Sequence, residues 1–489
     1  MSYAEGWPPA TPHDSEALVG ERQGRPVTAR LRRVDAELRS GVHPVARPAR
    51  GAGELLDDRR GAAGARPRRP QCLRDGGRRR GGGRPGPRGC ARLAFGPTRG
   101  VGRPARAGGP LLPRSLGCPA VDGLVEEPRS EAATIAAVAA RYRAGELAAW
   151  GPLGSGHIHE TFFARLRTAG GEERELVLQR MNETVFPDLG AVMENLERIA
   201  AHPDLAGFVP ALLRTAEGES VVHDEGGRPW RAFDRITGTV SFDEVDDPEL
   251  VRAAARAFGE FVQRLATLAG PPLREPLPGF HDTRARYAAF EAAVARDSFG
   301  RAGPLRPEIA ALRERGELTE LLVPGELPLR VTHNDTKINN VLFEKGTRRA
   351  VAVVDLDTVT PGLLAWDFGD LVRSATNPVA EDSPDPGRAT LRCDLFAALA
   401  RGWFEGAGPL MTPDEHRSLV PGGLVMTYEL ALRFATDFLE GDRYFRTRDD
   451  QHNLRRIRVQ LQMLASMEGQ RAELEAIIAE QKATPDGNQ

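Results

Sequence analysis

Several residue types are scarce in this chain of 489 residues, and each shortage excludes a class of protein. No run of about 18 apolar residues occurs, which excludes a transmembrane helix, and the first residues lack the basic leader and apolar core of a signal peptide. The four cysteines have neither paired spacing nor neighbouring histidines, so neither a zinc site nor a disulfide framework is indicated. They are Cys72, Cys90, Cys118 and Cys393. We therefore expect a cytoplasmic protein with no membrane partner.

Lysine is also scarce, since only three of the 66 basic residues are lysines, and no G-K-[ST] string occurs. A Walker-type phosphate loop is therefore not expected. The string GPLGSGHIHETFF instead places a glycine loop between two expected strands. Glycine lets backbone N–H groups approach phosphates closely, so we predict that Gly154, Ser155 and Gly156 contact ATP. The alternative is an ordinary β-hairpin that contains glycine.

Basic charge is concentrated in the first 120 residues. They hold 24 arginines, no lysine and 10 acidic residues, against 42 basic and 58 acidic residues in the remainder, so the net charge of −2 is a cancellation. With 21 glycines and 15 prolines, they predict a disordered Arg/Gly/Pro-rich segment over residues 1–128. Phe95 is the only aromatic residue between Arg47 and Arg114, so base-stacking platforms are missing and we do not expect nucleic-acid binding. An alternative is that this segment is not native to the working protein.

The rest of the chain predicts an α+β fold with two lobes. A helical pattern near residue 135 is followed by β-like runs at 147–154, 160–168 and 173–181, a helix over 188–202, and two more strands near 221 and 231. Long helical patterns then dominate, interrupted by a β-like block over 329–359. We expect a small β-rich N-lobe over 129–240, a larger and mostly helical C-lobe over 241–480, and a tail over 481–489. The sequence leaves the oligomeric state open.

The β-like block carries the residues that indicate chemistry. The string VTHNDTKINN contains H-x-D-x-x-x-x-N at His333, Asp335 and Asn340, and Asp355 follows the buried-looking strand AVAVV. Phosphoryl transfer from ATP requires this kind of set: one carboxylate faces the attacking hydroxyl, while an amide oxygen and a second carboxylate hold Mg²⁺ against the phosphates. We predict that Asp335 orients or deprotonates the acceptor hydroxyl and that Asn340 and Asp355 are ligands of Mg²⁺. The competing interpretation is that Asp335 and Asn340 only cap turns.

Two neighbours of these residues have further expected roles. His333 braces the loop by hydrogen bonding, and Lys337 neutralises charge on the transferred phosphoryl group, although a loop lysine is often merely solvated. Asp367 begins a D-F-G string, but it follows Asp355, so we interpret it as the start of a helix-capping segment and not as a metal ligand.

These strings resemble the aminoglycoside phosphotransferase family, small-molecule kinases with a protein-kinase-like fold, and within it most closely the bacterial N-acetylhexosamine 1-kinases. The resemblance runs from about residue 147 to 466 and is carried by GSGHIHETFF, VTHNDTKINNVLF, VVDLDTVTPGLLAWDFGDLVRSATN and LRFATDFLEGDRYF. It implies that Asp335 is the catalytic aspartate and that ATP and Mg²⁺ are bound. It also implies that Asp357, Arg433 and Tyr444 surround a sugar; packing of Arg433 and Tyr444 is the alternative.

The sequence departs from the kinase pattern on the third strand. A lysine that contacts phosphate is expected there, but LVLQRMN offers Gln179 or Arg180. We predict that Arg180 binds phosphate oxygens as a forked donor and that Glu194 or Glu197 on the following helix orients it.

The sequence therefore predicts an ATP-dependent kinase of a small-molecule sugar substrate, with the anomeric hydroxyl of an N-acetylhexosamine (GlcNAc or GalNAc) as acceptor. The same reaction on another hydroxyl compound, such as an aminoglycoside or an amino alcohol, is one alternative. A non-catalytic regulator that binds ATP or a sugar is another.

Overall fold

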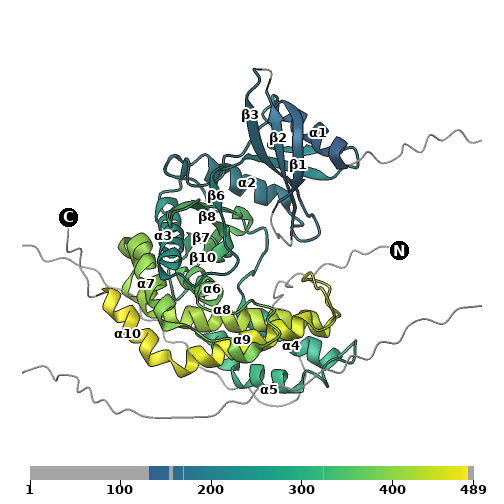
Figure 1. Cartoon of the computed structure of the whole chain (residues 1–489). Coiled ribbons are helices and arrows are strands. Elements are labelled where there is room, and N and C mark those ends of the chain that lie inside the picture. Colours follow the sequence, from purple (N-terminus) through teal and green to yellow (C-terminus); the bar gives the residue numbers. More distant parts are fainter. Residues whose placement is uncertain (1–130, 154–157, 169, 323, 483–489) are drawn as a thin grey trace, which may run out of the picture. The chain divides into compact units, whose positions relative to one another are not determined.

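The computed structural model describes residues 131–153, 158–168, 170–322 and 324–482 (Figure 1). The predictions of a disordered segment over 1–128 and of a tail over 481–489 fall almost wholly outside this range and stay predictions. The described elements confirm the α+β class, with a β-rich N-terminal part followed by a mostly helical part. No helix in the described part is both long and apolar enough to cross a membrane.

The N-terminal part is an antiparallel sheet in the order β1-β2-β3-β5-β4. Its strands are β1 (Glu146–Pro152), β2 (Glu160–Arg167), β3 (Glu173–Arg180), β4 (Val221–His223) and β5 (Pro229–Asp234). Helix α1 (Glu131–Arg141) packs its apolar residues into the same small core as one face of the sheet, and α2 (Leu189–Ala200) follows β3. Asp188 starts α2 by accepting the Ala191 N–H at 2.8 Å, as expected of a helix-capping aspartate.

Short strands carry the predicted chemical block, as the sequence indicated. β6 (Thr239–Val240), β8 (Val341–Glu344) and β9 (Ala350–Val353) form one sheet, while β7 (Arg330–Thr332) pairs with β10 (Thr360–Gly362). The 3₁₀ turns η3 (Ile338–Asn340) and η4 (Leu356–Thr358) come directly before β8 and after β9. The two loops that carry the candidate site therefore start and end on hydrogen-bonded strands.

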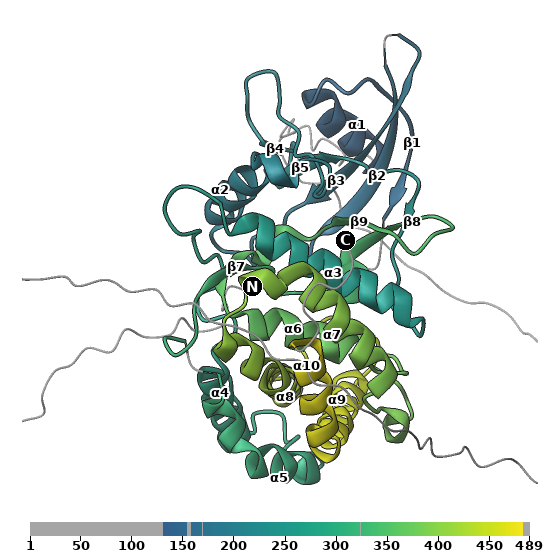
Figure 2. The same cartoon turned by 90° about the vertical axis from the view of Figure 1, so that its left-hand side faces the viewer.

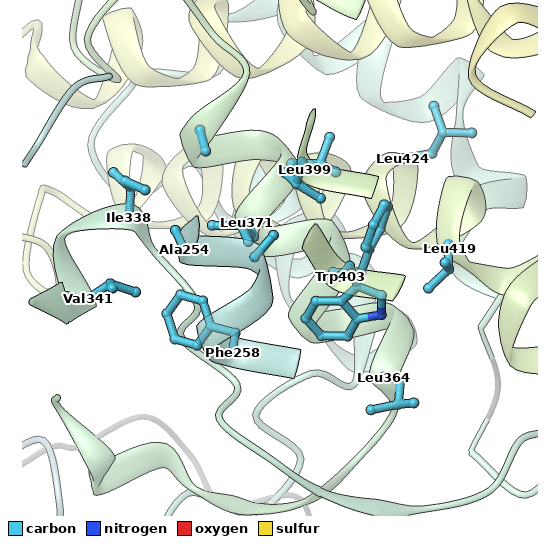
Figure 3. Close-up of a cluster of buried hydrophobic side chains, with 14 of the residues drawn as sticks. Ala254, Phe258, Ile338, Val341, Leu364, Leu371, Leu399, Trp403, Leu419 and Leu424 are labelled. Atoms are coloured by element: carbon cyan, nitrogen blue, oxygen red, sulfur yellow. The ribbon is translucent and has the colours of Figure 1, made fainter. Parts of the chain in front are cut away.

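The remaining helices form the larger core. They are α3 (Pro248–Leu265), α4 (Thr283–Arg296), α5 (Arg306–Glu314), α6 (Leu364–Ala375), α7 (Cys393–Ala407), α8 (Pro413–Leu439), α9 (His452–Gly469) and α10 (Arg471–Lys482). Helices α8 and α9 lie side by side (Figures 1 and 2). Ala254 and Phe258 of α3 pack near Leu371 of α6 and Trp403 of α7 (Figure 3). This core supports the β-like block, because Phe258 and Phe261 lie edge-on to the His333 ring.

Helices α3 and α7 approach each other closely at glycines, which gives a stability prediction. A Cβ at Gly402 would lie 2.0 Å from the Arg252 carbonyl oxygen, so the backbones must separate in Gly402→Ala. We expect the free energy of unfolding to fall by about 1–3 kcal/mol in urea or thermal melts, as for other overpacked cores. In the control Gly469→Ala, at the end of α9, a Cβ would meet nothing within 4 Å, so stability should be kept or slightly raised. Equal effects of the two changes would contradict this packing.

Candidate active site

The loop between β7 and β8 carries the candidate catalytic aspartate. The Asp335 carboxylate is about one-fifth exposed, and its Oδ1 lies 2.7 Å from Lys337 Nζ. Asn340 Nδ2 donates to the Asp335 carbonyl oxygen at 2.8 Å and to Oδ2 at 3.2 Å. Burial opposes the charge on Asp335, but the Lys337 ammonium holds the pKa of that carboxyl below its usual range. The structure thus brings Asp335, Lys337 and Asn340 together, with the aspartate ionised and oriented.

His333 braces this loop, as the sequence analysis predicted. Its ring is fully buried; Nδ1 accepts the Asp335 backbone N–H at 3.3 Å, so the proton resides on Nε2, which donates to the Val354 carbonyl oxygen at 3.0 Å. Burial lowers the pKa of His333 and keeps the ring neutral, in the form that this pair of bonds requires. His333 therefore ties the Asp335 loop to the end of β9, next to Asp355.

Asp367 has a different place from the one we predicted. It lies inside the first turn of α6, and its carboxylate does not cap that helix; it accepts the backbone N–H groups of His333 at 2.8 Å and Asn334 at 2.7 Å. Thr336 Oγ1 also donates to the Asp367 carbonyl oxygen at 2.5 Å. Burial raises the pKa of Asp367 to about 7, against the lowering effect of the two N–H donors. Asp367 thus anchors the loop that carries Asp335 to helix α6, a role that local sequence patterns did not indicate.

The candidate metal ligand Asp355 ends the β9 segment in a left-handed conformation, with φ of 63°. Asp355 is exposed as a residue, and its carboxylate makes no hydrogen bond or ion pair with the described residues. Crowding by surrounding protein atoms and the nearby carboxylates of Asp357 and Asp335 raise its pKa to about 6. His159 and the Lys337 ammonium offset this repulsion only in part, so a bound cation would stabilise the three neighbouring carboxylates.

The donor set fits magnesium. Asn340 uses its amide nitrogen within the protein, which leaves its oxygen for a ligand, and Asp355 supplies a carboxylate; both are hard oxygen donors. No cluster of three or more His, Cys, Asp or Glu side chains suited to a metal exists in the described ranges. Mg²⁺ typically takes only one or two protein carboxylates and completes its shell with phosphate and water oxygens. A two-residue protein site is therefore sufficient.

Asp357, predicted to contact the sugar, is buried at 4% exposure and has partners from the N-terminal sheet. Arg231 of β5 donates to both carboxylate oxygens, at 2.6 and 2.7 Å, and His159 Nε2 lies 2.5 Å from Oδ2. Burial opposes ionisation, but the Arg231 guanidinium and His159 hold the pKa of Asp357 well below its usual range. Both oxygens are occupied by protein donors, so a direct role in sugar binding stays a prediction.

Arg180, predicted to bind phosphate, lies on the other face of the sheet from its neighbour Gln179. Its guanidinium pairs with Glu131 of α1 and with Glu160, and lies 4.7 Å from the Trp230 ring centroid. Successive residues of a strand point to opposite faces, and Gln179 instead accepts from Arg231 Nε at 2.9 Å.

The expected orientation of Arg180 by the helix after β3 does not occur. Glu194 pairs with Arg274, and Glu197 contacts Ser220 and Arg214. The ion pairs with Glu131 and Glu160 therefore hold the Arg180 side chain on the face of the sheet that α1 covers. The predicted ATP-contacting residues Gly154, Ser155 and Gly156 lie outside the described residues.

Arg433 and Tyr444, the other predicted sugar contacts, lie close together. Arg433 Nη2 is 3.4 Å from the Tyr444 hydroxyl, and the guanidinium lies 5.0 Å from the Phe280 ring centroid. Arg433 is one helical turn from Glu429 on α8, which bonds to His281 at 2.9 Å, and His281 Nε2 lies 3.0 Å from the Asn334 carbonyl oxygen. These contacts link Glu429, one helical turn from Arg433, to the residue before Asp335.

An ionised aspartate beside a loop lysine, with oxygen donors for a metal just before β8 and just after β9, is the kind of residue set that phosphoryl transfer requires. The chain matches the model of the phosphotransferase enzyme family known as APH over residues 149–409, more than half of its length, and belongs to that family. It is an ATP-dependent small-molecule kinase with a hydroxyl group as acceptor.

Several solved structures are similar to this chain at low identity. A microcompartment-associated aminopropanol kinase is 14% identical with a TM-score of 0.45, over 70% of this chain and 98% of that one. An aminoglycoside phosphotransferase from Alicyclobacillus acidocaldarius is 16% identical with a TM-score of 0.46, over 73% and 100%. An amicoumacin kinase in complex with AMP-PNP and Ca²⁺ is 11% identical with a TM-score of 0.46, over 68% and 93%.

Proposed function

We propose that this kinase transfers the γ-phosphoryl group of ATP to a hydroxyl of a neutral sugar, with the anomeric hydroxyl of an N-acetylhexosamine as the first candidate. The observation that supports a neutral acceptor is the pair of neighbouring guanidinium groups of Arg433 and Arg286. Burial and the Arg433 charge lower the pKa of the partly buried Arg286, and the Glu429 and Asp282 carboxylates offset this only in part. Two neighbouring guanidinium groups repel a polycation, whereas they donate hydrogen bonds to the hydroxyl and amide oxygens of a neutral sugar.

In this mechanism Asp335 orients the acceptor hydroxyl and takes its proton as the oxygen of the acceptor bonds to the γ-phosphorus and the bond from that phosphorus to ADP breaks. Lys337, 2.7 Å from Asp335, offsets negative charge beside the transferred group. Asn340 and Asp355 hold Mg²⁺, which when bound neutralises charge on the phosphate oxygens. Asp367 and His333 keep the loop in place, so that little rearrangement is needed when the hydroxyl attacks.

A panel of acceptors tests this proposal. We expect ADP release by the full chain to depend on GlcNAc or GalNAc more strongly than on glucose, galactose, kanamycin or 1-amino-2-propanol. Phosphorylation at the anomeric position removes the reducing end of the sugar. The loss of reducing ends in a reducing-sugar assay should therefore equal the amount of ADP released. Stronger turnover of kanamycin or the amino alcohol would instead select the second candidate function, a kinase of amine-bearing acceptors, for which other members of this fold are named.

Replacing Arg433 should separate acceptor binding from nucleotide binding. For Arg433→Ala we expect the KM for the acceptor to rise about tenfold or more, because a charged hydrogen-bond donor is lost, while the KM for ATP stays within about twofold. Steady-state kinetics with each substrate varied in turn measures both constants. The control Arg443→Ala removes a nearby exposed arginine that packs on Phe299. An unchanged acceptor KM in Arg433→Ala would remove this residue from the acceptor site.

A further inference from the structure

A buried ionic cluster joins the N-terminal sheet to the turn that carries the metal ligand. We call Arg231, His159 and Asp357 the Asp357 cluster; they are 2%, 8% and 4% exposed. Arg231 and His159 come from β5 and from the residue before β2, whereas Asp357 lies in η4, more than 120 residues further along the chain. An ion pair this deeply buried is costly to form unless further hydrogen bonds hold both charged groups in good geometry. The contacts of each member therefore show how the pair is held.

Each member of the Asp357 cluster is held by a further contact. Arg231 donates its Nε–H to Gln179, its direct neighbour across the β3–β5 pair, at 2.9 Å. His159 Nδ1 accepts the Asn182 backbone N–H at 3.0 Å, so the proton must reside on Nε2, which donates to Asp357. The carboxylate is therefore fixed by two N–H groups of one forked guanidinium and by one ring N–H, and both side chains are anchored on the sheet.

The cluster lies two residues from Asp355 in the same short turn. Asp355 has φ of 63°, a left-handed conformation that non-glycine residues adopt only when the surrounding structure enforces it. Its own carboxylate makes no hydrogen bond or ion pair with the described residues that would fix it. The contacts on Asp357 therefore restrain the turn on the C-terminal side of Asp355, while the bond from His333 Nε2 to the Val354 carbonyl oxygen restrains it on the other side.

We propose that Arg231 and His159 are positioning residues for the metal: by clamping Asp357, the N-terminal sheet sets the orientation of the Asp355 carboxylate toward Mg²⁺. The partners that orient a ligand in this way typically contribute 10- to 100-fold to metal affinity. On this view Asp357 serves the metal site indirectly and does not contact the acceptor.

A direct phosphate contact by Arg231 is the competing explanation, because β3 offers Gln179 where kinases have a lysine. The two explanations differ in the absence of metal. A positioning residue affects nucleotide binding only when Mg²⁺ is present, whereas a phosphate-binding arginine contributes with or without it. Arg231 is 98% buried, and its Nη1 and Nη2 groups already donate to Asp357. Both observations favour the explanation that Arg231 is a positioning residue.

The test uses the full chain and a non-hydrolysable ATP analogue in calorimetric titrations, with Mg²⁺ varied and with EDTA. For Arg231→Lys, which keeps the charge and loses the fork, and for His159→Ala, we expect the Mg²⁺ concentration that half-maximally tightens binding to rise about tenfold or more. Affinity for the analogue in EDTA should stay within about twofold. His159→Gln can accept from Asn182 and donate to Asp357, so it should restore most of the Mg²⁺ response.

Arg174→Lys is the matched control, because Arg174 pairs with Asp234 between the same two strands where both side chains are about two-fifths exposed. It should leave the Mg²⁺ response unchanged. Two results would overturn the proposal: a lower melting temperature in Arg231→Lys and His159→Ala with an unchanged Mg²⁺ response, or a loss of affinity in EDTA as large as the loss with Mg²⁺. Because the readout is nucleotide binding, it does not depend on the identity of the acceptor.

Discussion

Asp335→Asn should reduce turnover by about 10²- to 10⁴-fold and leave the fold intact. The amide keeps the shape of the side chain and can still accept from Asn340, but it cannot take the acceptor proton. It also removes the partner of Lys337, which is about 43% exposed and can be solvated instead. The kcat in the ADP-release assay should therefore fall, while the melting temperature and nucleotide affinity change little.

Asp243→Asn is a suitable control for this change. Asp243 is exposed and accepts from Asn339 Nδ2 at 3.1 Å, so it touches the same loop without belonging to the proposed site. Its kcat should stay near that of the unmodified protein. Turnover retained in Asp335→Asn would defeat the assignment of Asp335 as the catalytic aspartate.

Asp355→Asn should abolish most activity because it weakens the binding of Mg²⁺. The neutral amide is a weaker ligand for Mg²⁺ than a carboxylate, so we expect at least about a hundredfold loss of kcat/KM and little tightening of nucleotide binding by Mg²⁺. The exposed control Asp204→Asn should behave like the unmodified protein. A normal Mg²⁺ response in Asp355→Asn would exclude Asp355 as a ligand.

The same variant should be at least as stable as the unmodified protein at neutral pH without metal. The Asp355 pKa is about 6 in the folded protein against about 3.9 in an unfolded chain, so the fold binds the proton more tightly and loses stability as the pH rises from about 4 to 6. Asparagine carries no such charge and tolerates the left-handed conformation. In thermal melts with EDTA, the melting temperature of Asp355→Asn should exceed that of the unmodified protein at pH 7. The two melting temperatures should converge towards pH 4. A constant difference across this range would show that the Asp355 carboxyl is not perturbed.

Much of the fold could be predicted because its signals are local. The alternation in β2 and β3, the capping Asp188 before α2 and the apolar stripes of the helices each lie within one segment, and the structure confirms these elements. The H-x-D-x-x-x-x-N spacing likewise places Asp335, Lys337 and Asn340 on one loop, where hydrogen bonds of 2.7–3.2 Å join them.

Contacts between distant segments could not be predicted in this way. Period-2 alternation shows that Gln179 and Arg180 face opposite sides, but only the packing of α1 reveals which side is which. Asp367 resembled a helix cap locally, yet the backbone N–H groups that donate to it lie on a loop more than 30 residues earlier. A local pattern contains no information about which remote donor satisfies a buried carboxylate.

The sequence by itself therefore determined the class of chemistry, since a candidate catalytic aspartate, an asparagine and a strand-end aspartate are encoded in one short stretch around residues 333–355. Only the tertiary structure decided what each surrounding charge does. It turned Arg180 towards Glu131 and Glu160, and it brought Arg231 and His159 to Asp357 across 126 and 198 residues. Burying a charge requires a partner, and chain folding alone selects which residue provides it.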